Sequence, residues 1–189
     1  MSAPAAPAPR VLALDPMSRG FGYAVIEGPT SLVDWGIRNA ANDNTRAQLR
    51  KIRELIDLYH PDVIVIEDGR HDRSRRRQRV RAVVTQVAAL ATPETEVQLI
   101  PAALVRKVFG AGKAITKHQI ATLVTEHFPE LAYRLPPERK PWMPEDARFA
   151  IFDAVAFGLT YYYIEGEAPE RARQSPRTSL TAPIIHRNP

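Results

Sequence analysis

The chain has 189 residues, 44% of them hydrophobic, which suits one globular domain with a full core. It contains no cysteine and no apolar run near the roughly 18 residues of a membrane span, so disulfides, thiolate zinc sites and a membrane-spanning chain are excluded and a cytoplasmic location is expected. A net charge of +5 favours a polyanionic partner. Residues 1–10 lack the features of a secretory signal and are expected to form a flexible Ala/Pro tail.

Two apolar runs of strand length each end in an acidic residue. Residues 11–14 lead to Asp15, and residues 63–66 lead to Glu67. Such runs are typical of central strands covered on both faces. Open α/β sheets place ligand sites at the carboxyl ends of their strands, so two neighbouring acids there suggest a divalent-metal site.

The remaining elements follow from apolar periodicity and turn residues. We expect strands over 22–27 and 31–38, a helix over 45–59, and a strand over 62–67. After these come a helix over 80–91, a strand over 96–100, helices over 101–109 and 117–128, and a final helix from Pro144 to Tyr163. Residues 165–189 are expected to be a disordered tail.

This order of elements predicts an α/β fold. Three antiparallel strands are followed by parallel strands with helical crossovers, giving a mixed five-stranded sheet with helices on both faces. This is the RNase H-like architecture, expected over residues 11–164. In such a sheet the first and fourth strands are parallel neighbours, which would bring Asp15 and Glu67 together.

Residues 70–81 hold seven arginines in twelve positions. A charge run of this kind is often only a solvated face. Here, however, it begins three residues after Glu67, so its cations would surround the acidic site. That placement favours a phosphate backbone approaching a metal centre.

Four blocks of the sequence resemble Holliday junction resolvases of the RuvC type. Residues 14–23 resemble the opening strand and turn of that family, and residues 61–67 resemble its second acidic strand. Residues 105–119 resemble the basic segment before its fourth helix, with about one residue inserted, and residues 153–160 resemble its final helix. Together the blocks span residues 11–163 in the family's order.

The resemblance implies a homodimeric nuclease that cleaves branched DNA, such as four-way junctions, with two Mg²⁺ or Mn²⁺ ions per active site. Asp15 would bridge the ions, Glu67 would hold one of them, and Asp153 would close the site. Lys117 would approach the scissile phosphate. No membrane and no small-molecule cofactor are expected. The residues expected to contact DNA are Arg70, Arg73, Arg75, Arg76, Arg77, Arg79, Arg106, Lys107, Lys113 and Lys117.

Each of these roles has a plainer alternative. Asp15 is also a suitable turn residue before Pro16, and Asp68 competes with Glu67 because successive strand residues face opposite sides. Asp153 is alternatively an acid on a helix surface, but its neighbours in the sequence are apolar, so its carboxylate needs a partner. The basic residues suit plain solvated charge equally well. The helix over 80–91 is a candidate dimer surface or simply a cover for the sheet.

The chain departs from the family at the fourth metal ligand. The family places an acid or a histidine three residues before the final Asp, where this chain has Ala150. Asp146 is the candidate replacement, but seven residues along a helix span about 10.5 Å, which is too far for Asp146 and Asp153 to share two ions directly. Asp146 also suits a helix-dipole role.

Three functions therefore compete. The first is a metal-dependent, structure-selective endonuclease, and the second is a catalytically weakened protein that binds branched DNA or acts in assembly. The third is a phosphotransferase of the actin/hexokinase superfamily, which is disfavoured because the chain lacks a second domain to close over a nucleotide. A transposase core is disfavoured because no separate DNA-recognition module is present.

Overall fold

The computed structural model describes residues 8–40, 45–68, 75–140 and 142–167, and the side chains of all of these except residues 75–79. Its centre is a five-stranded sheet in the order β3-β2-β1-β4-β5. The strands are β1 (Arg10–Met17), β2 (Gly20–Glu27), β3 (Leu32–Asn39), β4 (Val63–Glu67) and β5 (Glu96–Ile100). The pairs β1–β2 and β2–β3 are antiparallel, and β1–β4 and β4–β5 are parallel, which confirms the predicted topology.

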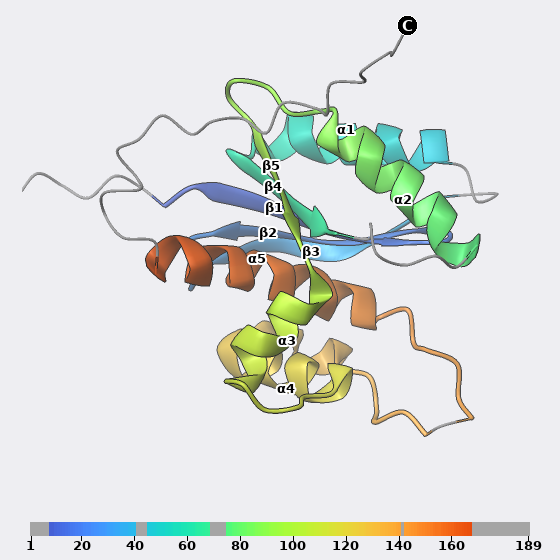
Figure 1. Cartoon of the computed structure of the whole chain (residues 1–189), viewed down its shortest axis with the longest axis vertical. Helices are drawn as coiled ribbons and strands as arrows, with labels where there is room; N and C mark the ends of the chain where they lie inside the picture. The colour runs from blue at the N-terminus through green and yellow to red at the C-terminus, as the bar shows by residue number, and fades with distance from the viewer. Residues whose placement is uncertain (1–7, 41–44, 69–74, 141, 168–189) are drawn as a thin grey trace, which may run out of the picture.

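Helices cover both faces of this sheet (Figure 1). On one face lie α1 (Thr45–Tyr59) and α2 (Arg75–Ala88). On the other lies α5 (Phe149–Glu167), with α3 (Ala102–Gly110) and α4 (Lys117–His127) packed against it. A 3₁₀ helix, η2 (Pro129–Arg134), follows α4. No helix in the described ranges combines the length and apolarity needed to cross a membrane.

Strand β1 divides the core into two layers. Val11 and Ala13 pack toward α5, whereas Leu12 and Leu14 pack toward α1 and α2, and all of these side chains are fully buried. This alternation is the period-two geometry of a strand. The expectation of a central strand covered on both faces is confirmed.

Helix α5 approaches the sheet closely because small residues lie at the contact. A Cβ on Gly22 would lie 2.2 Å from the carbonyl oxygen of Ala150, so the first turn of α5 rests directly on the β2 backbone. A Cβ on Gly158 would lie 2.6 Å from Cδ1 of Ile26. The glycines therefore allow α5 to lie directly on β2, in which Gly22 is paired with Asp15 of β1.

Two helix boundaries differ from the sequence prediction. Helix α2 begins at Arg75 rather than residue 80, and its Val83, Val84 and Val87 are buried against the sheet, so that face covers the core instead of offering a dimer surface. Helix α5 begins at Phe149 rather than Pro144 and continues to Glu167, beyond the predicted start of the tail. The rest of the predicted tails, residues 1–7 and 168–189, lies outside the described residues.

The late start of α5 has a local cause. The carboxylate of Asp146 accepts a hydrogen bond from the backbone N–H of Arg148 at 2.9 Å, as the side chain of an N-cap residue does. The backbone N–H groups of Phe149, Ala150 and Ile151 then donate to carbonyls three residues earlier. Glu145 and Asp146 consequently lie in the segment before the helix, so the predicted spacing along a continuous helix was wrong.

Candidate active site

The parallel pairing of β1 and β4 brings the two strand-end acids together. Leu14 is paired with Ile66, and Asp15 and Glu67 are the next residue on each strand. On β4, Val63 and Val65 face the α5 side of the sheet, so Glu67, two residues further on, lies on the same side. On β1, Asp15 lies on this side as well, because it follows Val11 and Ala13 at the same spacing. Asp68, the next residue, would point to the opposite side of the sheet. The structure thus places Asp15 and Glu67 on one face at one edge.

Helices α4 and α5 bring Lys117 and Asp153 to the same edge. Lys117 is the first residue of α4, which begins with a capping box in which the Thr116 and Gln119 side chains exchange hydrogen bonds with each other's backbone N–H. The Lys117 Nζ donates to Oδ2 of Asp153 at 2.7 Å and also to Oε1 of Glu145. The Asp153 side chain is 17% exposed, so Lys117 is the partner that its burial requires.

The charges of these residues act on one another. Burial raises the pKa of the Asp15 carboxyl well above its ordinary value, and the negative charges of Asp153, Glu67 and Glu145 raise it further, against the effect of Lys117. Partial burial lowers the pKa of Lys117, but the attraction of Asp153, Glu145 and Asp15 outweighs it and leaves that pKa raised. Burial likewise raises the pKa of Asp153, against the opposing effect of Lys117. The site is an acidic cluster that attracts cations.

Asp15, Glu67, Lys117 and Glu145 line a cleft of about 610 Å³, here called the acidic cleft. Asp153 is not among the lining residues and is joined to the cleft through its contact with Lys117. Four carboxylates and two cationic side chains are among its described lining residues. The lining residues are Asp15, Pro16, Met17, Ser18, Arg19, Asn39, Glu67, Val80, Lys117, Glu145, Asp146, Ala147 and Ala150.

Asp146 and Ala150 occupy different positions in this cleft from those that the sequence suggested. Both line it, but the guanidinium of Arg148 binds the two carboxylate oxygens of Asp146 at 2.7–3.1 Å. The hydrogen bonds from Arg148 lower the pKa of Asp146. Ala150 is buried against β2 and offers no ligand atom in its side chain.

The basic residues predicted to contact DNA fall into two groups. Arg106 and Lys107 are exposed on α3, and Lys113 is exposed in the turn that leads to α4. Arg70 and Arg73 lie outside the described residues, and so do the side chains of Arg75, Arg76, Arg77 and Arg79 on the first turns of α2. Val80, which follows them on α2, lines the acidic cleft.

The donor set fits hard divalent cations, which prefer carboxylate oxygens. The Asp15 carboxylate lines the cleft and accepts no hydrogen bond from any described group. Its burial raises its pKa. Within the described ranges, no three of the acidic or imidazole side chains converge as a ready-made ion site. Glu145 and Asp153 converge instead on the Lys117 ammonium, which shows that a positive charge is accommodated between them.

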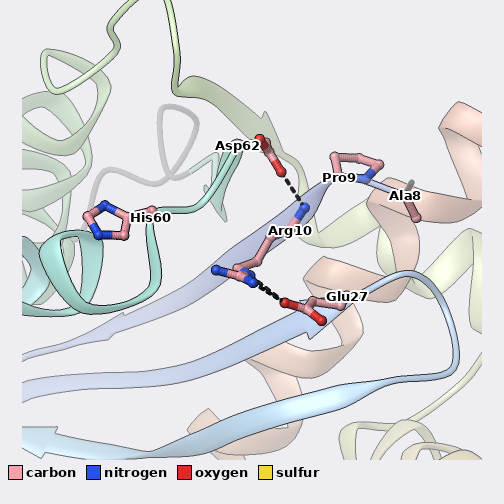
Figure 2. A pocket seen from close by; sticks show the side chains of 6 residues that line it. All are labelled: Ala8, Pro9, Arg10, Glu27, His60 and Asp62. Carbon is pink, nitrogen blue, oxygen red and sulfur yellow. Dashed lines mark hydrogen bonds and ion pairs between the residues drawn. The ribbon is translucent and has the colours of Figure 1, made fainter. Parts of the chain in front are cut away.

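A second hollow, the amino-end pocket, lies at the opposite end of β1 (Figure 2). Its charged groups are paired with one another: the backbone N–H of Arg10 donates to Asp62 at 2.7 Å, and the Arg10 guanidinium binds Glu27 and, at 2.5 Å, the carbonyl of Tyr59. These contacts join β1 to β2 and to the end of α1. They stabilise the sheet rather than form a reactive centre.

Sequence reasoning missed the position of Glu145. The sequence prediction placed Glu145 and Asp146 in the first turn of the last helix and named only Asp146 as a candidate ligand. The signal for the alternative is the Asp146–Arg148 spacing, which suits a side chain that caps a helix start and therefore engages Asp146 locally.

The family model described as "Crossover junction endodeoxyribonuclease RuvC" matches residues 11–156. Curated proteins give no match. Among solved structures, T. thermophilus RuvC in complex with a Holliday junction substrate has 16% sequence identity and a TM-score of 0.60, covering 84% of this chain and 96% of that one. A second structure of Thermus thermophilus RuvC has 17% identity and a TM-score of 0.56, covering 83% and 96%. At this identity the structural likeness shows the fold.

Proposed function

Because the chain belongs to the RuvC family of Holliday junction resolvases, the crossover junction endodeoxyribonucleases, we propose that it cleaves four-way DNA junctions by metal-dependent hydrolysis. The observation that supports this proposal is that Asp15 and Glu67, from two distant strands, line one cleft together with Lys117, which in turn binds Asp153 of α5. The Asp15 carboxylate in particular lacks a hydrogen-bond donor among the described residues while it faces that cleft.

Asp15, Glu67 and Asp153 are the residues that would hold Mg²⁺ or Mn²⁺. Bound there, a pair of ions would activate water and neutralise the charge that develops on the leaving oxygen. Lys117 contributes a positive charge beside the same carboxylates and is 53% exposed, so its ammonium can also contact a phosphate of the DNA strand.

Arg106, Lys107 and Lys113 would bind the DNA backbone near the α3–α4 turn. Their exposure supports this role, and contacts with phosphates confer affinity and salt dependence with little sequence preference. The arginines of residues 70–79 would extend this surface along the first turns of α2. A homodimer would place two acidic clefts on the two strands of one junction.

The central experiment incubates a synthetic four-way junction with the wild-type protein and the Asp15→Asn variant, in Mg²⁺ and in Mn²⁺. We expect paired nicks on opposing strands that disappear in the variant, while junction binding persists. A linear duplex of the same sequence is the control for structure selectivity. Junction binding without cleavage by the wild type in either metal would instead support a non-catalytic branched-DNA-binding protein, for which the alanine at position 150 is the motivation.

The backbone contacts are tested by the salt dependence of junction binding. Replacement of Arg106, Lys107 and Lys113 by Ala should reduce the slope of log K against log salt by about 0.9 for each phosphate that the protein no longer neutralises. Arg50→Ala on α1, in the other helical layer, is the matched control and should leave the slope unchanged. An unchanged slope in the triple variant would remove these residues from the interface, and sedimentation analysis would test the dimer.

A further inference from the structure

We propose that Glu145 supplies the fourth carboxylate of the metal site, in place of the ligand that is missing at Ala150. The inference rests on the proposed metal-dependent function and assigns one further residue to that site. Glu145 belongs to the segment before α5, outside the helical position that the family uses, so the site keeps four acids by drawing one from a different part of the backbone.

The position of Glu145 is defined by a shared contact. Its Oε1 and the Oδ2 of Asp153 both accept hydrogen bonds from the Nζ of Lys117. Two oxygens bound to one nitrogen lie within about 6 Å of each other, since each hydrogen bond spans about 3 Å. Glu145 and Asp153 can therefore approach one cation together, and Lys117 shows where that cation is accommodated.

Glu145 also faces the strand-end acids. It lines the acidic cleft together with Asp15 and Glu67. Its side chain is 43% exposed, so its carboxylate has freedom to turn from Lys117 toward an ion without disturbing the core.

Asp146, the neighbouring acid, is engaged elsewhere. Its two oxygens bind the Arg148 guanidinium, and one of them also accepts the backbone N–H that starts α5. For Asp146 to bind a metal ion, both contacts would have to break, and the helix start would lose its cap. Glu145 would give up only its ion pair with Lys117, a cation that a metal ion would replace.

The test measures Mn²⁺ binding by isothermal titration calorimetry, without DNA, for the wild type, Glu145→Gln and the matched control Asp146→Asn. We expect Glu145→Gln to weaken Mn²⁺ affinity by at least about tenfold. Removal of a group that only hydrogen-bonds to a metal ligand already costs this much. Asp146→Asn should stay within about twofold of the wild type. The reverse result, or no loss in Glu145→Gln, would overturn the assignment.

Two further variants separate direct ligation from an effect through Lys117. In a Lys117→Met background, Glu145→Gln should still weaken Mn²⁺ binding; no further loss would mean that Glu145 only positions Lys117, and would refute direct ligation. Ala150→Asp added to Glu145→Gln should recover Mn²⁺ affinity, since Ala150 lines the same cleft. If the double variant folds but its Mn²⁺ affinity stays as low as that of Glu145→Gln, a carboxylate at position 150 does not replace Glu145, and the assignment is contradicted.

These outcomes are distinct from failure of the proposed function. If the wild type binds no Mn²⁺ and cuts no junction, the metal-dependent function itself is wrong. If the wild type binds Mn²⁺ and cuts, and Glu145→Gln does both equally well, only the assignment of Glu145 is wrong. A melting-temperature measurement for each variant confirms that the compared proteins are folded.

Discussion

The two ends of strand β1 carry charged residues in opposite arrangements. At the amino end, Arg10 is bound to Glu27, to the carbonyl of Tyr59 and, through its backbone N–H, to Asp62. At the carboxyl end, Asp15 faces further carboxylates, and its pKa is raised by burial and by their charges. Paired charges of the first kind hold elements together. Crowded acids of the second kind cost stability and indicate a site that awaits a cation.

The strongest test of this contrast is the cleavage rate of two matched aspartate variants. Asp153→Asn at the carboxyl end should slow junction cleavage about a thousandfold, because a ligand to the catalytic ions contributes several kcal/mol and each 1.36 kcal/mol is tenfold in rate. Asp62→Asn at the amino end should cleave at the wild-type rate. If Asp153→Asn cleaved the junction at a rate within tenfold of the wild-type rate, the carboxyl end of β1 would not be the catalytic end.

The second test compares glycines at the two ends by chemical denaturation. Gly22, paired with Asp15, has no room for a Cβ because the Ala150 backbone is in the way, so Gly22→Ala should lower the free energy of unfolding by at least about 1–3 kcal/mol. Gly28, at the amino end, has φ +72° and a Cβ there would lie 3.3 Å from that of Ala8. Gly28→Ala should therefore cost only the left-handed penalty of about 1–2 kcal/mol. A loss below about 1 kcal/mol in Gly22→Ala would show that α5 does not rest on β2 as described.

The third test asks whether the acids at the carboxyl end oppose each other. A raised pKa means that the folded protein disfavours ionised Asp15, so stability decreases as the pH rises from the ordinary aspartate pKa toward the raised value. At neutral pH without divalent ions, Asp15→Asn should raise the melting temperature by about 2–4 °C for each kcal/mol of repulsion removed. Added Mg²⁺ should stabilise the wild type more than the variant. A lower melting temperature for the variant would contradict the repulsion.

The smallest effect is expected for the ion pair at the amino end. Glu27→Gln removes its salt bridge with Arg10, and because both side chains are partly exposed the loss should be only about 0.2–1 kcal/mol. This loss should shrink in high salt. Thermal denaturation of this variant beside Asp15→Asn provides the check. If Glu27→Gln also stabilised the protein, charge removal would have the same effect on stability at both ends of β1, and the contrast would fail.

The central sheet and the strand-end acids could be predicted because local patterns encode them. The run at residues 11–14 is apolar throughout and its side chains are buried on both faces, so Asp15 stands at the point where the strand leaves the core. The same pattern ends at Glu67, which was preferred to Asp68 because of the family resemblance, since alternation alone leaves the choice open. The cap at Thr116 is a local feature of the same kind, because it joins two residues that are three positions apart.

The composition of the site beyond those acids was decided by tertiary structure. Proline and acidic residues at 144–146 have the local signature of a helix start, yet the Asp146 carboxylate forms its hydrogen bonds with Arg148 and α5 begins at Phe149. Lys117 meets Glu145 and Asp153 across 28 and 36 residues of sequence, so no local pattern signals the contact. Apolar periodicity and helix caps depend on residues a few positions apart, so a sequence displays them. Which of the two adjacent acids contacts Lys117 depends on how α4 packs against the start of α5, and that packing is decided only in the folded chain.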